Sequence, residues 1–377
     1  MAKKLRVGIL FGGRSGEHEV SLLSAASVLK AIDRTKFDVV PIAINKSGHW
    51  LTGGAATGLL EGGQVSTSPA DSESAVSEPA TELSVAAPSA IDSHAALDGQ
   101  GLDVVFPVLH GTFGEDGTIQ GLFEMAGIAY VGSGVLGSAA GMDKDLMKRL
   151  FTEAKLPIVK HVTLLRAEWR KSPRKAIARV ESVLRYPVFV KPANLGSSVG
   201  ISKVHDRGEL GPALEVAAKY DRKLVVEHGV GGKKAKAREL EVAVLGNDDP
   251  KASVVGEIIP GKEFYDYEAK YLSEGSVPVI PANLTRAESK QVREMALSAF
   301  RACDLSGLAR VDFLMEPDGK RRIYLNEVNT MPGFTKISMY PKLWEASGLP
   351  YTELITRLID LALERQEEKK QTTYSRE

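Results

Sequence analysis

Four polar side chains alternate with apolar ones in two neighbouring segments of the chain. Segments 307–313 and 323–329 read GLARVDF and IYLNEVN, with a Pro-Asp-Gly turn between them. Successive side chains of a strand point to opposite faces of a sheet, and a short turn makes two strands antiparallel neighbours. We therefore expect a hairpin that presents Arg310, Asp312, Glu327 and Asn329, in alternation with the apolar Val311, Phe313, Tyr324 and Val328.

The chemistry that these side chains favour is metal-assisted phosphate chemistry. Carboxylate and amide oxygens are hard ligands suited to Mg²⁺, which takes its remaining oxygens from water and from substrate phosphates. An arginine beside them can hold phosphoryl or carboxyl oxygens. The alternative is a half-exposed sheet face on which an arginine pairs with an acid, which is ordinary for antiparallel sheets. The segments around the hairpin favour the first interpretation.

One loop has the composition of a phosphate-binding loop. Residues 191–200 read KPANLGSSVG, so backbone N–H groups can surround phosphate oxygens and Lys191 can reach them. A flexible hairpin turn is the alternative, since Gly-Ser turns are common. Residues 256–263, GEIIPGKE, match only seven positions of a P-loop, because Glu263 stands where Ser or Thr must hold Mg²⁺. The Gly12-Gly13 turn likewise lacks the GxGxxG spacing of a dinucleotide site.

Two further segments indicate a reaction from which water is excluded. Residues 262–271, KEFYDYEAKY, follow neither the strand nor the helix period, and they carry three tyrosines. A mobile lid over reacting groups has this composition. Directly after Asn329, the Pro332-Gly333 turn can direct backbone N–H groups at a carbonyl oxygen that is becoming an oxyanion.

The composition restricts the class of protein. The 377 residues are enough for two to four domains with ample cores. Because 48 Lys and Arg balance 48 Asp and Glu, no overall field attracts nucleic acid or an anionic membrane, and we expect neither as a partner. Cys303 is the only cysteine, which suits a reducing compartment. No stretch approaches the roughly 18 apolar residues of a membrane span, and residues 1–11 indicate a first strand rather than a secretion signal.

The elements that position these residues follow from periodicity. A strand at 5–11, a glycine turn at 12–16, a helix and a strand at 39–44 predict an open parallel sheet with crossover helices. Its ligands should lie at the carboxyl ends of the strands. Residues 53–99 are rich in small and polar residues and lack aromatic ones, so we expect a low-complexity surface insertion, partly disordered. The expected domains are 1–137, which is α/β, and two α+β units at 138–230 and 231–377.

These motifs resemble those of the ATP-grasp superfamily, and within it those of the D-alanine:D-alanine ligase family. The matches run in order along almost the whole chain outside 53–99. They are GGRSGEHEVS at 12–21, HG at 110–111, GEDG at 114–117, MDK at 142–144, KPANLGSSVG at 191–200, YDYEAKY at 265–271, RVD at 310–312, EVNTMPG at 327–333 and Ser338. The resemblance implies an N-terminal open-sheet domain followed by two mixed domains that sandwich ATP. It also implies ligation of two D-alanine molecules through a D-alanyl phosphate, for peptidoglycan precursor synthesis in the cytoplasm.

The resemblance further implies roles for individual residues. Two Mg²⁺ ions, or Mn²⁺ in their place, would be held by Asp312, Glu327 and Asn329. The ATP contacts would be Lys144, Lys191, Ser198, Glu227, Glu239 and Lys270, with the lysines at phosphates and Glu227 on the adenine side. The catalytic residues would be Glu17, Ser197, Tyr271, Arg310, Gly333 and His110. Glu17 would receive the ammonium of the first D-alanine, Arg310 and the Gly333 backbone would stabilise the acyl centre, and Ser338 would hold the second substrate's carboxylate.

The pattern departs from the family at one connection. Residues 229–237 lengthen the chain before the Arg-Glu pair that contains Glu239, the implied ribose contact. Tyr271 favours D-alanine as the second substrate, because ligases that use D-lactate often have phenylalanine there. The alternatives are a D-alanine:D-lactate ligase or another carboxylate–amine ligase on the same scaffold, and a nucleotide-binding regulator without catalysis. The resemblance also suggests a homodimer.

Overall fold

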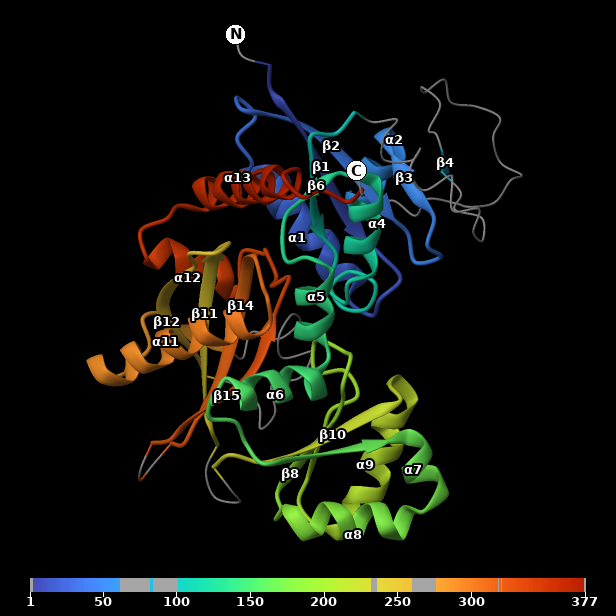
Figure 1. Ribbon diagram of the computed structural model, residues 1–377, viewed down its shortest axis with the longest axis vertical. Helices are drawn as coiled ribbons and strands as arrows, with labels where there is room; N and C mark the ends of the chain where they lie inside the picture. Colours follow the sequence, from blue (N-terminus) through green and yellow to red (C-terminus); the bar gives the residue numbers. More distant parts are fainter. Residues whose placement is uncertain are drawn as a thin grey trace.

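The computed structural model shows three units, each built around one β-sheet (Figure 1). It describes residues 3–61, 82–83, 101–231, 236–259, 276–317, 319 and 321–375. In the view of Figure 1 the N-terminal unit lies at the top, the C-terminal unit lies below it on the left, and the central unit lies at the bottom. None of the helices in these described ranges is long and apolar enough to cross a membrane.

The N-terminal unit contains a six-stranded sheet in the order β4-β3-β2-β1-β5-β6. Four of its strands run parallel, and helix α1 (His18–Ala31) crosses over between β1 and β2. The open parallel sheet that the sequence predicts is therefore confirmed. The remaining bounds are β1 Leu5–Gly12, β2 Phe37–Ile44, β3 Trp50–Thr52, β4 Glu82–Leu83, β5 Val104–Val108, β6 Ala129–Tyr130 and α4 Thr118–Ala126.

The segment expected to be a surface insertion starts as regular structure. Residues Gly53–Leu60 form helix α2, and Ala56 on this helix is completely buried in the core of the N-terminal unit. The expectation of a surface insertion from residue 53 onward is therefore wrong for its first turns. Small residues pack closely against a sheet, so a low-complexity composition alone does not distinguish a buried helix from a polar loop. Residues 62–81 and 84–100 lie outside the described part of the chain.

The central unit is a four-stranded antiparallel sheet in the order β7-β10-β8-β9, covered by helices. The sheet and its helices agree with the α+β character that the sequence predicts for this unit. Helices α5 and α6 lead into it from the N-terminal unit (Figure 1). The bounds are α5 Val135–Met142, α6 Lys144–Glu153, β7 His161–Leu165, α7 Arg166–Lys171, α8 Pro173–Val183, β8 Val188–Pro192, β9 Ser202–Val204, α9 Arg207–Tyr220 and β10 Lys223–His228.

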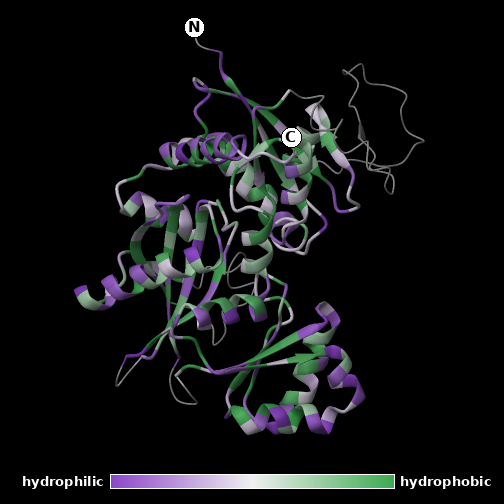
Figure 2. Cartoon of the chain, in the orientation of Figure 1, coloured by the Kyte–Doolittle hydropathy of each residue, from purple (hydrophilic) through white to green (hydrophobic). Residues whose placement is uncertain are grey.

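The C-terminal unit is a five-stranded antiparallel sheet in the order β13-β12-β11-β14-β15. Helix α11 begins with a capping box, in which Thr285 and Glu288 satisfy each other's backbone N–H groups, and it packs its apolar side against the sheet. Figure 2 shows hydrophobic residues concentrated in the strands and hydrophilic ones on the outer helices. The bounds are β11 Arg238–Gly246, β12 Lys251–Ile259, β13 Val277–Val279, α11 Arg286–Ala302, β14 Gly307–Met315, β15 Ile323–Asn329, α12 Met339–Ala346 and α13 Tyr351–Lys369.

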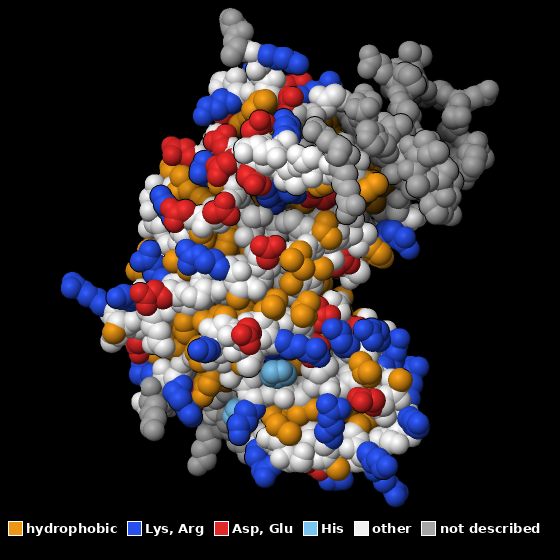
Figure 3. Space-filling view, in the orientation of Figure 1, with side chains coloured by type: hydrophobic (Ala, Val, Ile, Leu, Met, Phe, Trp, Pro, Cys, Tyr) orange, Lys and Arg blue, Asp and Glu red, His pale blue; other side chains and the backbone are white. Residues whose placement is uncertain are grey.

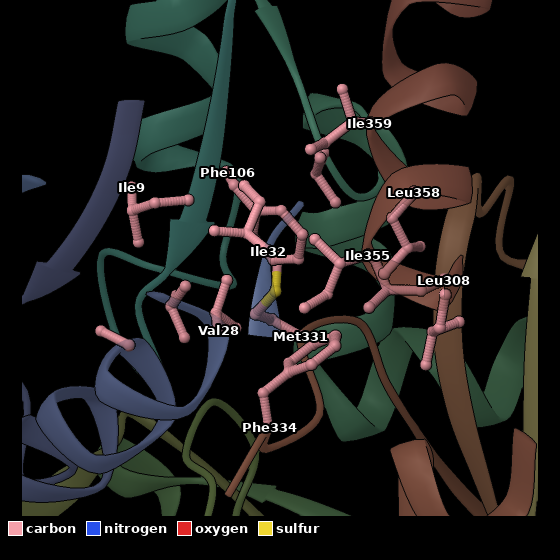
Figure 4. Packing of buried hydrophobic residues seen from close by; sticks show 14 of the residues in the cluster. Ile9, Val28, Ile32, Phe106, Leu308, Met331, Phe334, Ile355, Leu358 and Ile359 are labelled. Carbon is pink, nitrogen blue, oxygen red and sulfur yellow. The ribbon is translucent and has the colours of Figure 1, made fainter. Parts of the chain in front are cut away.

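Helix α13 returns from the C-terminal unit and packs against the N-terminal unit (Figure 1). Ile355 and Leu358 on this helix, which are both fully buried, join a core that contains Phe106 of β5 and Leu308 of β14 (Figure 4). Burial of a large aliphatic side chain stabilises the folded protein by about 1.5–3 kcal/mol. A single core thus spans two units, so the loops at their common boundary are held in a definite relation.

Positive charge is concentrated on the central unit, although the chain as a whole is neutral. Figure 3 shows Lys and Arg side chains gathered on its surface, whereas acidic and basic groups mix over the rest of this face. Helices α7 and α8 contribute five exposed basic residues, which are Arg170, Lys171, Arg174, Lys175 and Arg179. The balanced composition therefore does not describe the local field of this unit.

Candidate active site

Two adjoining pockets contain most of the residues that the sequence pattern singled out. The larger pocket lies between the central and C-terminal sheets and is lined by Lys144, Lys191 and Glu227 on one side and by Asp312 and Glu327 on the other. The smaller pocket is lined by residues of the N-terminal and C-terminal units. They include Glu17, His110, Gly333 and Ser338. The two pockets share the lining residues Glu115, Gly196, Ser197, Glu241, Arg310 and Asn329.

The predicted hairpin is present as strands β14 and β15. Arg310 pairs with Asn329 and Asp312 pairs with Glu327 in the antiparallel register. The Arg310 guanidinium donates from Nε and Nη2 to the two oxygens of Asp312, both at 2.7 Å, and the Asn329 amide donates to Asp312 Oδ2 at 2.9 Å. Glu241 of β11 lies 3.3 Å from Arg310 Nε. The polar face of the hairpin therefore forms one wall of the larger pocket.

This wall has the donor chemistry of a Mg²⁺ site. Asp312 and Glu327 bring two carboxylates to neighbouring positions of the sheet, and Asn329 adds an amide oxygen. No group of three or more His, Cys, Asp or Glu side chains able to hold a metal occurs in the described ranges, so the candidate site relies on two carboxylates. A site with few protein ligands suits Mg²⁺, which keeps waters and binds substrate phosphates.

One assignment of the hairpin's apolar face is wrong. The register shifts between Asp312 and Phe313, which leaves an extra residue on β15 before Glu327. Leu325, not Tyr324, is therefore buried with Val328, while the Tyr324 hydroxyl reaches Glu316 on the open side. A bulge changes which side chains share a face, and the alternating pattern carried no sign of it.

Two lysines implied as phosphate contacts lie in the larger pocket. Lys144 follows Asp143, whose side chain accepts the backbone N–H groups of residues 145 and 146 and so starts helix α6. Lys144 Nζ donates to the Leu195 carbonyl at 2.8 Å and lies 3.6 Å from Glu327. Lys191 Nζ lies 2.9 Å from Glu227 Oε2. Lys144 thus approaches a carboxylate across the pocket and Lys191 approaches one on its own sheet, so an anion there would meet two positive charges.

Glu227 lies at the base of this pocket as the centre of a buried ion-pair cluster. Its two oxygens lie 3.0 Å from Lys148 Nζ and 2.9 Å from Lys191 Nζ. Burial alone would raise the pKa of Glu227, but the two ammonium groups outweigh burial and lower it to about 2. In turn, the negative charge of Glu227, together with other nearby carboxylates, outweighs the effect of burial and raises the pKa of Lys191. Glu227 therefore stays ionised and holds Lys191 in its charged form.

The sequence analysis assigned no role to Lys148, which is fully buried in this cluster. A signal was present, because Lys148 follows Lys144 by four residues in a helical segment and so lies on the same helix face. A lysine repeated on one face of a helix that borders a phosphate site is a candidate for the same pocket. In the structure its ammonium group forms a buried ion pair with the Glu227 carboxylate.

The Glu227 cluster should make stability depend on pH. Because its folded pKa of about 2 lies below the ordinary value of 4.5, its contribution is complete above about pH 4.5 and is lost as the pH falls toward 2. We expect the free energy of unfolding, measured with urea between pH 6 and pH 3, to fall more steeply for the wild type than for Glu227→Gln. Parallel curves for the two proteins would contradict this assignment.

Glu17 is a buried carboxylate in the smaller pocket. It stands at the N-terminal end of α1 and accepts a hydrogen bond from the Ser197 hydroxyl. The backbones of Gly111 and Gly196 approach it so closely that a Cβ at either position would overlap Glu17 Oε2. Ser197 itself has a φ of +46°, so its loop adopts a conformation that L-residues rarely take. The carboxylate is therefore enclosed by backbone and suited to a small cation such as an α-ammonium group.

His110 joins the N-terminal unit to the C-terminal unit. Its Nδ1 lies 3.0 Å from the Met331 carbonyl and its Nε2 lies 3.1 Å from Ser24 Oγ. Burial lowers the pKa of His110, although the Glu17 carboxylate and the Met331 carbonyl act in the opposite direction. The imidazole is thus neutral at physiological pH, and its ring nitrogens contact the Met331 carbonyl and the Ser24 hydroxyl rather than Glu17.

Gly333 and Ser338 close the far side of the smaller pocket. Ser338 precedes helix α12, and its hydroxyl accepts the Thr335 N–H at 3.0 Å. A Cβ on Gly333 would come within 2.7 Å of Ser338 Oγ, so only glycine fits there without displacement. The N-terminus of a helix favours anions, so a substrate carboxylate can bind beside Ser338.

Of the four remaining residues to which the resemblance assigns a role, two lie in the described part of the chain and two do not. Ser198 and Glu239 line the larger pocket. Lys270 and Tyr271 lie outside the described residues, as does the whole predicted lid at 262–271. Glu115 lines both pockets and received no role from the sequence. The sequence offered one signal for a role of Glu115, which is its position among the glycines of segment 110–117.

Comparisons with known proteins agree along the whole chain. The family model described as D-ala D-ala ligase N-terminus matches residues 6–133, and the one described as D-ala D-ala ligase C-terminus matches residues 150–360. The D-alanine–D-alanine ligase of Geobacillus thermodenitrificans is 51% identical over 373 residues, which cover 99% of each chain. That of Natranaerobius thermophilus is 50% identical over 367 residues, 97% of each chain.

Solved structures show the same architecture. A D-alanine–D-alanine ligase from Coxiella burnetii superposes with a TM-score of 0.76 at 33% identity, over 98% of this chain and 97% of that one. The VanG D-Ala:D-Ser ligase from Enterococcus faecalis gives a TM-score of 0.77 at 36% identity, over 96% and 100%. The three units thus form the ATP-grasp fold, and the chain belongs to the D-alanine–D-alanine ligase family.

Proposed function

We propose that the protein joins two D-alanine molecules to D-alanyl-D-alanine at the expense of ATP, for peptidoglycan precursor synthesis. The observation that carries this proposal is the continuity of the two pockets. An enclosed carboxylate, Glu17, lines the smaller pocket, and lysines with acidic oxygen donors line the larger one. An amino acid held by its ammonium at Glu17 can thus present its carboxylate toward a nucleotide's terminal phosphate.

The reaction needs activation because a carboxylate resists attack by an amine. Transfer of the γ-phosphoryl group of ATP to the first D-alanine gives an acyl phosphate, in which phosphate is a good leaving group. Such a transfer requires positioning and charge neutralisation more than covalent help. Lys144 and Lys191 supply positive charge at the phosphate side, and Glu227 keeps Lys191 charged and in place.

Family membership implies the use of ATP and a divalent metal, and we propose Mg²⁺ held by Asp312, Glu327 and Asn329. Mg²⁺ would supply a Lewis acid for phosphoryl oxygens, with two ions, or Mn²⁺ in their place, as the finer expectation. Arg310 holds Asp312 by both carboxylate oxygens, which orients this ligand on the pocket wall. The hairpin thereby holds its oxygen donors before substrate binds.

The second step is attack by the neutral amine of the second D-alanine on the acyl phosphate. We propose that Ser338 and the start of α12 hold the carboxylate of this second substrate. The Gly333 N–H and Arg310 would stabilise the tetrahedral oxyanion before phosphate departs. Lys270 and Tyr271 lie outside the described residues. The resemblance implies that Lys270 binds phosphate and that Tyr271, together with Ser197, is linked to Glu17 by hydrogen bonds.

The direct test is the purified enzyme with ATP, Mg²⁺ and D-alanine. We expect ADP, phosphate and D-alanyl-D-alanine in equal amounts. We also expect ligation to be faster with D-alanine than with D-lactate or D-serine as the second substrate. D-Lactate and D-serine belong in the assay because ligases of this scaffold differ at the second site, as the D-Ala:D-Ser ligase shows. Absence of turnover with D-alanine would overturn the proposal.

The cellular setting follows from the substrates. Because ATP and a single unpaired cysteine suit a reducing interior, we propose that the enzyme acts in the cytoplasm on small molecules, without nucleic acid or a membrane as partner. A homodimer is the expected assembly from the resemblance, and a sizing column measures it.

A further inference from the structure

A buried carboxylate at the junction of the two pockets belongs to the GEDG segment at 114–117 but has no role implied by the family resemblance. Glu115 belongs to the loop that precedes α4, and only 9% of its surface is exposed. It lines the larger and the smaller pocket alike. A buried acid needs a compensating partner, so its contacts indicate its role.

Both oxygens of Glu115 accept backbone N–H groups from different units. Oε2 accepts the N–H of Gly111 at 2.7 Å, and Oε1 accepts the N–H of Met331 at 3.0 Å. Gly111 follows the N-terminal sheet, whereas Met331 lies 216 residues further on from Glu115, just beyond β15. One carboxylate therefore bridges two loops that approach each other only in the folded protein.

Each bridged loop carries a group that the proposed reaction needs. Gly111 packs directly against the Glu17 carboxylate, so a shift of this loop changes the site for the first ammonium group. Met331 is two residues before Gly333, whose backbone faces the acyl centre. His110 holds the Met331 carbonyl at 3.0 Å while Glu115 holds the Met331 N–H, so the peptide groups before and after Met331 are each held by one side chain.

We propose that Glu115 is a positioning residue that sets the separation between the ammonium-binding carboxylate of Glu17 and the oxyanion-binding backbone at Gly333. The inference rests on the proposed function and adds to it a residue that acts through the two loops rather than on substrate. In a near-attack geometry a displacement of about 1 Å costs about a hundredfold in rate, so a bridge at this point has a large effect on turnover.

The electrostatics of Glu115 provide a second readout. Burial and the nearby Glu17 carboxylate raise its pKa to about 8, against the opposing effects of the Gly111 and Met331 N–H groups and of Arg310. The other titratable neighbour, His110, is kept neutral by burial. Because an ionised carboxylate accepts two N–H groups better than a neutral carboxyl, the bridge should tighten as the pH rises through about 8.

The test compares Glu115→Gln with Asp116→Asn in the complete enzyme. Glutamine offers one acceptor oxygen, while its NH₂ opposes the second N–H. We expect kcat to fall about tenfold to a hundredfold, the KM for ATP to stay within about twofold, and the part of the pH–rate profile that titrates near pH 8 to disappear. Asp116 is the matched control, since among the described residues its oxygens accept N–H groups from its own loop, those of Phe113 and Thr118. Asp116→Asn should keep wild-type kcat.

Three results would overturn the inference. They are an unchanged kcat and pH profile in Glu115→Gln, an equal loss in Asp116→Asn, and a wild-type Met331 amide whose hydrogen-exchange protection does not increase between pH 7 and pH 9. The exchange measurement needs no variant, so it holds even if Glu115→Gln does not fold. An inactive wild type would instead overturn the proposed function, which separates the two failures.

Discussion

Replacing Asp312 by alanine is expected to reduce kcat by about a thousandfold or more while leaving the protein folded. A bound metal stabilises the charge of the transition state by several kcal/mol, and each 1.36 kcal/mol of activation free energy changes the rate tenfold. Stability should change little, because Arg310 keeps its contact with Glu241 when Asp312 is removed. The measurements are single-variant kinetics with saturating ATP and D-alanine, together with a thermal unfolding curve.

A matched control lies on the same hairpin. Glu316, beyond the pocket, binds Arg322 and accepts a hydrogen bond from Tyr324, so Glu316→Ala also removes a paired carboxylate from β-structure. This variant should keep wild-type kcat. An Asp312→Ala enzyme that retains more than a tenth of wild-type kcat would show that Asp312 is not a metal ligand.

The substitution Glu17→Gln should lower kcat/KM for D-alanine by about a hundredfold to a thousandfold. Removing one partner of a buried charge pair costs about 2–5 kcal/mol, and the substrate ammonium would lose the counter-charge that the backbones of Gly111 and Gly196 enclose. Ser197 can still hydrogen-bond to the amide oxygen, so the loop should persist. Initial rates at varied D-alanine and fixed ATP measure the effect.

The comparison variant for Glu17 is two residues away. Glu19 is exposed on α1 and pairs with Lys46 at the surface, so Glu19→Gln removes a similar charge from the same helix without touching the pocket. It should leave kcat/KM within about twofold of wild type, since surface ion pairs contribute little. If Glu17→Gln instead raised the KM for ATP and spared D-alanine, the assignment of the ammonium site would be wrong.

Local sequence pattern determined the secondary elements and the chemistry of individual loops. Period-two alternation with a short turn was enough to predict the β14–β15 hairpin, and the order strand, glycine turn, helix, strand predicted the parallel sheet. Motifs in a constant order along the chain indicated the family. These inferences succeed because turn residues and side-chain alternation act over a few residues.

Local pattern failed where neighbours in space decide the outcome. The bulge beside Asp312 buries Leu325 in place of the expected Tyr324, and helix α2 formed in a segment expected to be a surface insertion. The resemblance implied an adenine-side role for Glu227 but did not identify its buried partner Lys148. A charge in the core is stable only with a counter-charge, and that partner comes from another element.

The sequence by itself therefore determined most of the groups that the site contains, since residue type and local spacing fix the carboxylates, lysines and glycines, although it gave no role to Lys148 or Glu115. Only the tertiary structure decided which of these groups meet. Glu17 meets Ser197 of the central unit, and Glu115 joins Gly111 to Met331. The second contact forms because a shared apolar core brings α13 and the C-terminal sheet onto the N-terminal unit. Burial of apolar surface is non-directional, so no local pattern encodes these meetings; they follow from packing of the whole chain.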